Sequence, residues 1–197
     1  MSSKVTVEKS TFSESLSIVG RAVASSPHLP ILSNILIESD GGQLRLAATD
    51  LTLGVSIWMD ARLDGQIALT LPAKTLTDIV NSLADSEVQF TVNGKPEAAI
   101  KSGTFKGVVR GIEASEFPAI PEHDVSSGIA FEATLLKEMI QATAFAASTD
   151  EARPVLEGVQ LSLGGNTLTM AATDGFRLAV KKTTLPDKVS SKQVIIP

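Results

Sequence analysis

An internal repeat with a fixed offset of 124 residues constrains the fold of this 197-residue chain more than any other feature. Residues 30–50 align without a gap on residues 154–174, and the block Ala47–Asp50 is identical to Ala171–Asp174. A repeat of this length marks one structural unit that the chain uses more than once. The sequence therefore predicts two copies of a single fold.

The first copy has a hydrophobic pattern that changes in a fixed order. Val5 and Val7 alternate with polar neighbours, which is typical of a strand. Ser10 then offers an N-cap hydroxyl, and apolar residues at helical spacing follow it, so we expect a helix over residues 10–24. Alternating apolar residues between turn residues predict three antiparallel strands, over residues 31–37, 44–46 and 51–57.

The second copy repeats the order of strand, helix and three strands. Ile129 and Phe131 predict its first strand, and Thr134 is the expected N-cap of a helix over residues 134–147. A turn at Gly164–Gly165 separates two of the expected strands. The three strands of this copy are predicted over residues 155–163, 168–172 and 176–180.

A weaker echo of the unit follows the first copy. Residues 66–71 predict a strand and residues 72–83 a helix, and three more strands are expected over residues 88–92, 98–101 and 104–110. The first domain, over residues 1–120, therefore holds two units, and the proline-containing segment 116–122 is the expected linker. Residues 121–197 hold one unit, which predicts the truncated first half of a second domain. The predicted fold class is α+β, with repeated β-α-β-β-β units.

Composition narrows the classes of function. Cysteine is absent, which excludes disulfides, a thiolate nucleophile and cysteine-ligated zinc. A net charge of −5 disfavours uniform electrostatic adhesion to DNA or to an anionic membrane. Neither a signal peptide nor an apolar run of membrane-spanning length is present in the sequence, so we expect a cytoplasmic protein.

The sequence contains no recognisable catalytic constellation. His28 and His123 are the only histidines, and their spacing does not suit a metal site. Asp50 and Asp174 occupy equivalent places in two copies of one unit, which argues against a paired acid and base. We therefore expect a protein without enzymatic activity, metal or cofactor; a small-molecule-binding α+β enzyme is the weakest alternative.

Six short motifs occur in a fixed order along the chain, namely Leu29–Leu36, Ala48–Asp50, Leu71–Lys74, Glu116–Pro118, Arg153–Leu156 and Ala172–Ala179. Together they resemble the motifs of the β sliding clamp family of bacterial DNA polymerase III. The resemblance covers the whole chain and implies a DNA-clamp fold, with helices on the inner face of a ring and antiparallel sheets outside. It implies three similar domains per subunit and a homodimeric ring around duplex DNA. A stand-alone peptide-binding adaptor that does not encircle DNA is the alternative.

The resemblance also implies a site for partners, including the replicative polymerase and clamp-loader subunits. In the family, a short linear motif of the partner docks between the second and third domains. Gly175 and Arg177 are the stronger candidates, because the first copy lacks them, whereas the Thr-Asp pair occurs in both copies and is predicted to stabilise a turn. Phe176 replaces a histidine found in some relatives. The predicted pocket residues are Leu156, Thr173, Gly175, Phe176, Arg177 and Leu178.

Candidate DNA contacts lie on the three predicted helices, whose formal charges each sum to zero. A face without a basic stripe fits a ring that holds DNA by topology, since tight phosphate contacts would hinder sliding. Lys74 is the first candidate, followed by Arg21 and Lys137. Residues 104–110 are the expected edge strand for contact between subunits.

Overall fold

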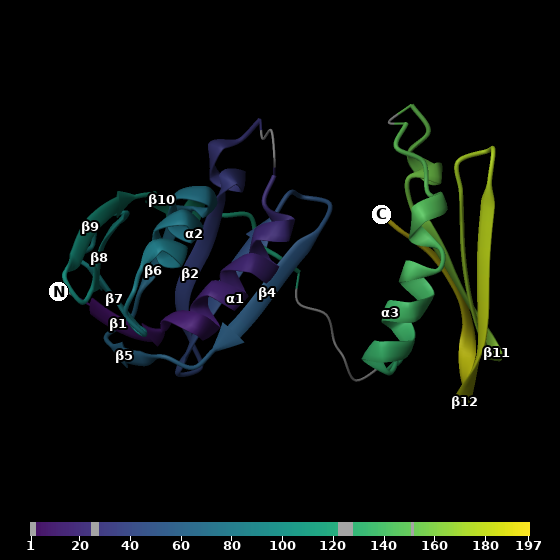
Figure 1. Ribbon diagram of the computed structural model, residues 1–197, viewed down its shortest axis with the longest axis horizontal. Helices are drawn as coiled ribbons and strands as arrows, with labels where there is room; N and C mark the ends of the chain where they lie inside the picture. Colours follow the sequence, from purple (N-terminus) through teal and green to yellow (C-terminus); the bar gives the residue numbers. More distant parts are fainter. Residues whose placement is uncertain (1–2, 25–27, 122–127, 151) are drawn as a thin grey trace. The chain divides into compact units, whose positions relative to one another are not determined.

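The computed structural model describes residues 3–24, 28–121, 128–150 and 152–197. The chain divides into two compact units, within residues 1–122 and 123–197, and each has its own hydrophobic core. Figure 1 shows sheets and helices in both. Glu122, the last residue of the predicted linker, and His123 lie outside the described residues.

Two antiparallel sheets of five strands form the first unit (Figure 1). The strand order is β5-β1-β7-β8-β9 in one sheet and β10-β6-β2-β3-β4 in the other. The strands are β1 (Ser3–Glu8), β2 (Asn34–Asp40), β3 (Gln43–Thr49), β4 (Gly54–Met59), β5 (Arg62–Asp64), β6 (Ala68–Pro72), β7 (Glu87–Val92), β8 (Glu97–Ser102), β9 (Phe105–Arg110) and β10 (Ile112–Glu113).

Within the first unit, the first copy and the weaker echo at residues 66–110 exchange their first strands. β1 begins the first copy but pairs with β7 of the echo, from Ser3 opposite Val92 to Glu8 opposite Glu87. β6 begins the echo but pairs with β2 of the first copy. Each copy therefore completes the sheet of the other, which explains why the repeated units fold as one body.

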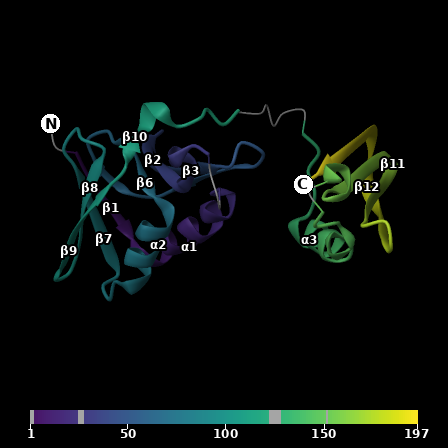
Figure 2. The same cartoon turned by 90° about the horizontal axis from the view of Figure 1, so that it is seen from above.

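Helices α1 (Lys9–Val19) and α2 (Ala73–Ser82) pack against each other, and Figure 2 shows them side by side. Phe12, Leu16 and Val19 of α1 are fully buried, as their helical spacing predicts. The ring of Phe12 meets the ring of Phe90 edge-on, with centroids 5.2 Å apart. The apolar stripe of α1 thus anchors the helix in the core.

The predicted helix caps and ends need correction. Ser10 and Thr134 are not N-caps, because α1 and α3 (Ala133–Gln141) begin earlier, after Glu8 and Glu132. The Ser10 hydroxyl instead donates to the Glu8 carboxylate at 2.7 Å. The Lys9 N–H donates to the Ser86 carbonyl at 2.7 Å, which fixes the start of α1 in a way that the local sequence does not reveal.

Both long predicted helices also end early. Short 3₁₀ helices follow α1 and α3, namely η1 (Gly20–Ala22) and η5 (Ala144–Ala146). α2 ends at Ser82, close to its predicted end at residue 83.

Two predicted strands of the first copy begin later than expected. Residues 30–33 form the 3₁₀ helix η2 (Pro30–Ser33), so β2 starts at Asn34. β4 starts at Gly54, not at residue 51, because the Asp50 carboxylate accepts the N–H groups of Thr52 and Leu53 and holds these residues in a turn. A 3₁₀ helix and a tight turn thus replace the first residues of these two predicted strands.

The second unit combines α3 with β11 (Val159–Thr173) and β12 (Leu178–Ile196), which pair antiparallel. β11 includes the predicted turn at Gly164–Gly165. Gly165 has a φ of +59°, close to the +56° of its counterpart Gly41 between β2 and β3, and the register of the ladder shifts on both sides of it. Met139, Leu168 and Met170 are the largest fully buried side chains of this unit.

The strand predicted around Ile129 and Phe131 does not form, although both side chains pack against the core of the second unit. In the first unit the equivalent strand, β1, lies between β5 and β7. β7 belongs to the weaker echo at residues 66–110, which has no counterpart within residues 123–197. The segment 128–132 thus lacks the neighbour that would make it a strand.

Among the described residues, no helix is long and apolar enough to span a membrane.

Candidate peptide-binding site

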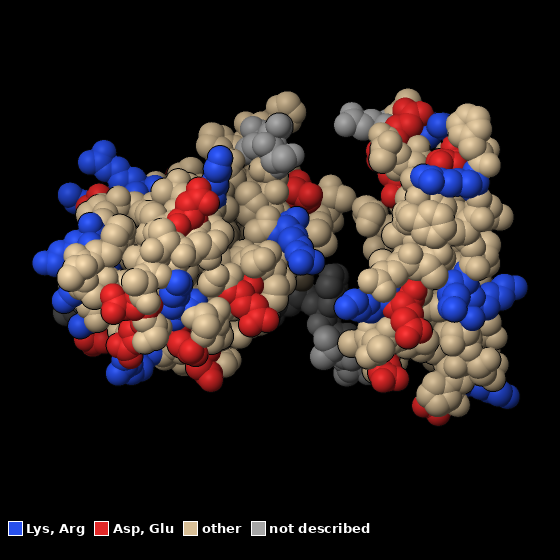
Figure 3. Space-filling view, in the orientation of Figure 1, with Lys and Arg blue, Asp and Glu red and all other residues tan. Residues whose placement is uncertain are grey.

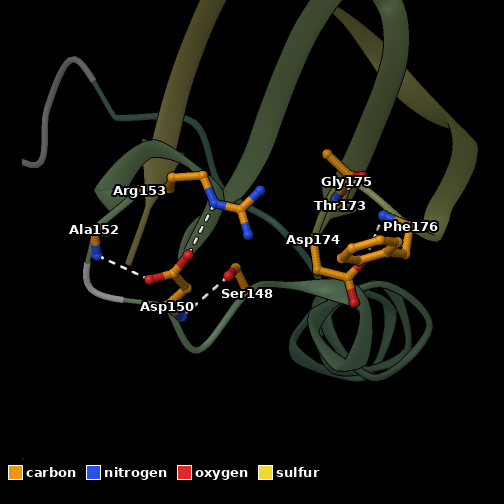
Figure 4. Close-up of polar contacts among 8 residues, drawn as sticks. All are labelled: Ser148, Asp150, Ala152, Arg153, Thr173, Asp174, Gly175 and Phe176. Atoms are coloured by element: carbon orange, nitrogen blue, oxygen red, sulfur yellow. Dashed lines mark hydrogen bonds and ion pairs between the residues drawn. The ribbon is translucent and has the colours of Figure 1, made fainter.

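A turn built by Thr173 and Asp174 connects β11 to β12. The Thr173 hydroxyl accepts the Gly175 N–H at 3.1 Å and donates to the Arg177 carbonyl at 2.7 Å. The Asp174 carboxylate accepts the N–H group of Phe176 (Figure 4) and that of Arg177, both at 2.9 Å. Both polar side chains are therefore used to hold the backbone of this turn.

The equivalent turn in the first unit has the same three hydrogen bonds from backbone N–H groups to the Thr and Asp side chains. Thr49 accepts the Leu51 N–H at 3.0 Å, and Asp50 accepts those of Thr52 at 2.8 Å and Leu53 at 2.7 Å. The prediction that the repeated Thr-Asp pair stabilises a turn is confirmed.

Backbone donors keep both aspartates ionised. The Arg177 N–H, followed by the Phe176 N–H, lowers the pKa of Asp174, and the Leu53 N–H, followed by the Thr52 N–H, lowers the pKa of Asp50. Such carboxylates act as acceptors in their own turns. They are unsuited to the general-acid role that a paired acid and base would need.

The two turns differ at one backbone position. Leu51 has a φ of +77° and is the only non-glycine residue with a positive φ among those that the structure describes. Its counterpart in the repeat is Gly175, with a φ of +91°. The first turn therefore holds a leucine in a conformation that favours glycine.

We expect Leu51→Gly to stabilise the first unit by about 0.5–1 kcal/mol, because relief of the left-handed strain exceeds the entropic cost of glycine. Leu51→Ala is the matched control: it removes the same exposed side chain but keeps the strain, so stability should stay within about 0.5 kcal/mol of the parent. Denaturant unfolding followed by Trp58, the only tryptophan, reports on this unit. Equal stability of the two variants would contradict the strain argument.

A pocket of about 200 Å³ lies beside the turn of the second unit. Three predicted residues, Leu156, Thr173 and Leu178, line it. The other lining residues, which the sequence analysis missed, are Val155, Gly158, Gln160, Ala171, Ala172 and Ile195.

Gly175, Phe176 and Arg177 do not line the pocket but form the turn at its edge. The expected contact of Phe176 with the pocket needs correction, because its side chain is 96% exposed. The Phe176 N–H is bound by Asp174, which holds this residue in the turn (Figure 4). Its aromatic ring is left available at the surface.

Ile195 forms one wall of the pocket because Gly158 lets it approach. A Cβ atom on Gly158 would lie 2.3 Å from the Ile195 Cγ2 atom and 2.9 Å from the Ile196 carbonyl oxygen. In the first unit the equivalent of Gly158 is Asn34, whose side chain is buried and donates to the Thr70 hydroxyl at 2.9 Å. A side chain thus fills the place that the second unit leaves without one.

Two guanidinium groups flank the turn. Arg177 pairs with Asp174 at 2.9 Å, and its guanidinium lies 5.9 Å from the centre of the Phe145 ring. Arg153 pairs with Asp150 at 3.0 Å (Figure 4), and its Nη1 atom is 3.4 Å from the Cβ position of Gly175. The apolar pocket therefore has cationic groups nearby that could orient a bound ligand.

The candidate DNA contacts are exposed on three separate elements. Arg21 lies in η1, Lys74 in α2 and Lys137 in α3, and none of them joins an ion pair among the described residues. α1 includes Lys9 in place of Arg21, so with Glu14 its formal charge still sums to zero. The Lys9 ammonium group donates to the Leu83 carbonyl, which ties it to the end of α2.

Among the described residues, no group of three or more His, Asp or Glu side chains could hold a metal ion.

β9 is an edge strand of its sheet, as predicted for residues 104–110.

Comparison with known proteins places both units in one family. Residues 3–121 match the model of the DNA polymerase III beta subunit, N-terminal domain, and residues 130–197 match that of its central domain. The beta sliding clamp of Synechococcus elongatus is 40% identical over 183 residues, which cover 91% of this chain and 48% of that protein. The chain spans about half the length of the curated relatives it matches.

Solved structures agree with this assignment. The beta chain of DNA polymerase III from Streptococcus pneumoniae superposes with a TM-score of 0.92 at 29% identity, covering 100% of this chain and 54% of that one. The Pseudomonas aeruginosa sliding clamp bound to griselimycin gives a TM-score of 0.89 at 28% identity, with coverage of 100% and 54%. The chain therefore belongs to the bacterial DNA polymerase III β subunit family, the β sliding clamps.

Proposed function

We propose that this chain acts as part of a sliding clamp, a non-enzymatic processivity factor in the cytoplasm. The ring, closed by two subunits, encircles duplex DNA without reading its sequence and tethers the replicative polymerase and clamp-loader subunits. Residues 1–120 form the first clamp domain, and residues 121–197 contribute the first half of the second. Membership of the β sliding clamp family supports this role, and nothing in the comparisons favours a stand-alone adaptor.

The pocket between Leu156 and Leu178 carries the proposal for partner binding. Its lining is mostly apolar, and the exposed Arg177 lies at its edge. A small apolar pocket beside a guanidinium suits a short peptide, because the pocket anchors an apolar side chain and the charge orients the chain. We therefore assign the six predicted pocket residues to one peptide site, with Gly175, Phe176 and Arg177 at its rim.

The test is fluorescence polarisation with a short labelled peptide that carries two adjacent leucines. We expect binding in the micromolar range or weaker, because the family resemblance places the other side of the groove in a third domain. Leu178→Asp should lower the affinity at least about tenfold, because it puts a charge beside apolar surface. Leu53→Asp, an exposed change in the first unit, is the control. Nanomolar binding, or equal binding by both variants, would contradict this assignment.

We also propose that Lys74, Arg21 and Lys137 face the DNA. Each is an exposed lysine or arginine on a helical element, which suits weak contacts with phosphates. Replacing any one of them with alanine should reduce the slope of log affinity against log salt by at most about 0.9, the value for one phosphate contact. Duplex binding at several salt concentrations measures this slope. An unchanged slope in all three variants would remove these residues from the proposal.

β9 is proposed as the edge that meets the partner subunit in the ring. It is the last strand of its sheet, so one side of its backbone has no strand neighbour within the described first unit.

A further inference from the structure

β12 carries an unusual concentration of positive charge for an acidic protein. It contains four lysines and one aspartate, whereas β11 contains no charged residue and the chain as a whole has a net charge of −5. In Figure 3, Lys and Arg side chains follow the part of the second unit that Figure 1 draws as β12. All four lysines are exposed, and none joins the ion pairs formed among the described residues.

One of these lysines shares a sheet face with the peptide pocket. Leu178 lies opposite Thr173, Val180 opposite Ala171 and Lys182 opposite Thr169. These residues alternate with Ala172, Met170 and Leu168, whose side chains are buried in the core, so they project from the other face. Leu178, Val180 and Lys182 therefore form a row that leads from the pocket along β12.

The first unit shows how the same face looks when it is closed by its own side chains. At the positions equivalent to Lys182, Thr169 and Ser162 it has Trp58, Arg45 and Glu38, which lie opposite one another in register. Arg45 pairs with Glu38 at 2.8 Å and lies 5.4 Å from the centre of the Trp58 ring. The cation on that face thus has an acidic partner within its own sheet.

Within the described part of the second unit, Lys182 lies on this face without an acidic residue at the positions equivalent to the Arg45–Glu38 pair. Ser162 replaces Glu38 and Thr169 replaces Arg45, so no carboxylate lies at the equivalent positions. Val180 is 51% exposed and continues the apolar surface from the pocket toward Lys182. An extended ligand anchored in the pocket could therefore follow this row and bring its own negative charge.

We propose that Lys182 selects partner peptides that carry an acidic residue about four positions from their apolar anchor. The inference rests on the proposed function, since it assumes that a peptide occupies the pocket. Four residues along a strand span about 13 Å, so the acidic residue lies about four positions from the anchor in an extended peptide. A peptide is favoured over a nucleic acid because an apolar pocket and the exposed Val180 precede the charge, whereas phosphate backbones need rows of cations.

Two labelled peptides with the same pair of leucines test this selectivity. One carries aspartate about four residues from the leucines on each side, and the other carries serine at those positions. At low salt, about 50 mM, the acidic peptide should bind about two- to fivefold more tightly, and the difference should disappear at about 500 mM. Lys182→Glu should reverse the preference, so that a peptide with lysine at the same positions binds best.

Lys188→Glu is the matched control, because it makes the same change of charge on β12 further from the pocket and should keep the wild-type preference. If the wild-type chain binds none of the peptides, the proposed peptide site itself is wrong. If it binds the acidic and serine peptides equally, only the role of Lys182 is overturned. Displacement of the acidic peptide by oligo(dT), with loss of oligonucleotide binding in Lys182→Glu, would instead assign this face to nucleic acid and overturn the inference.

Discussion

Replacing Phe12 with alanine is expected to lower the free energy of unfolding of the first unit by about 3–5 kcal/mol. The side chain is fully buried on α1 and meets Phe90 of β7 edge-on, so the change removes both its burial and an aromatic contact. Phe12 lies in the first copy of the β-α-β-β-β unit, and Phe90 lies in the echo at residues 66–110. The variant therefore weakens the contact through which the two copies share one core.

Denaturant unfolding followed by Trp58 fluorescence measures this loss, because the single tryptophan lies in β4 of the same unit. Ile18→Ala is the control. Ile18 is on the same helix but 43% exposed, so its replacement should cost less than about 1 kcal/mol. A loss below about 1 kcal/mol for Phe12→Ala would show that the helix is not anchored as described.

The β-α-β-β-β order of the unit could be predicted from the sequence, because the internal repeat and the hydrophobic spacing both indicate the same order of strands and helix. Leu16 and Val19 follow Phe12 at helical spacing, and the structure buries all three on one stripe. The repeat offset also predicted that Asp50 and Asp174 have the same structural role, which their matching hydrogen bonds confirm. Such features depend on residues close together in the chain.

The parts that could not be predicted depend on strands that are distant in the sequence. The start of α1 is fixed by a hydrogen bond from Lys9 to Ser86, and no local cap residue indicates it. The strand expected around Ile129 does not form. Its equivalent in the first unit, β1, pairs with the distant strand β7, and the sequence of the segment itself does not reveal whether such a partner is present. A period-two pattern identifies a potential strand, but its neighbours decide whether it joins a sheet.

The pocket was only partly predictable for the same reason. Leu156 and Leu178 were expected from the family resemblance, and both line it. Gln160 and Ile195 were missed, although they lie opposite each other, because they meet only through the register of β11 and β12. Gly158 is informative only after Asn34 is recognised as its filled counterpart. Comparison of the two copies position by position could have indicated that difference.

Gly158→Ala is expected to remove the pocket wall and to lower affinity for the leucine peptide at least about tenfold. The new Cβ atom would lie 2.3 Å from the Ile195 Cγ2 atom and 2.9 Å from the Ile196 carbonyl oxygen. The Ile195 side chain can rotate away, but the backbone oxygen can move only if the end of β12 shifts. Overpacking of this kind costs about 1–3 kcal/mol, which should appear as faster hydrogen exchange in the amides that pair residues 159–163 with 192–196.

Gly164→Ala is the matched control, because it is in the same strand and its added Cβ atom would have no heavy atom within 4 Å. It should change stability by less than about 0.5 kcal/mol and leave peptide binding intact. The double change Gly158→Ala with Ile195→Ala separates the two effects. It relieves the closest clash, so exchange at the end of β12 should slow relative to Gly158→Ala, but it also deletes the wall, so peptide binding should stay weak. Full binding by either Gly158 variant would show that the wall formed by Ile195 is not part of the peptide site.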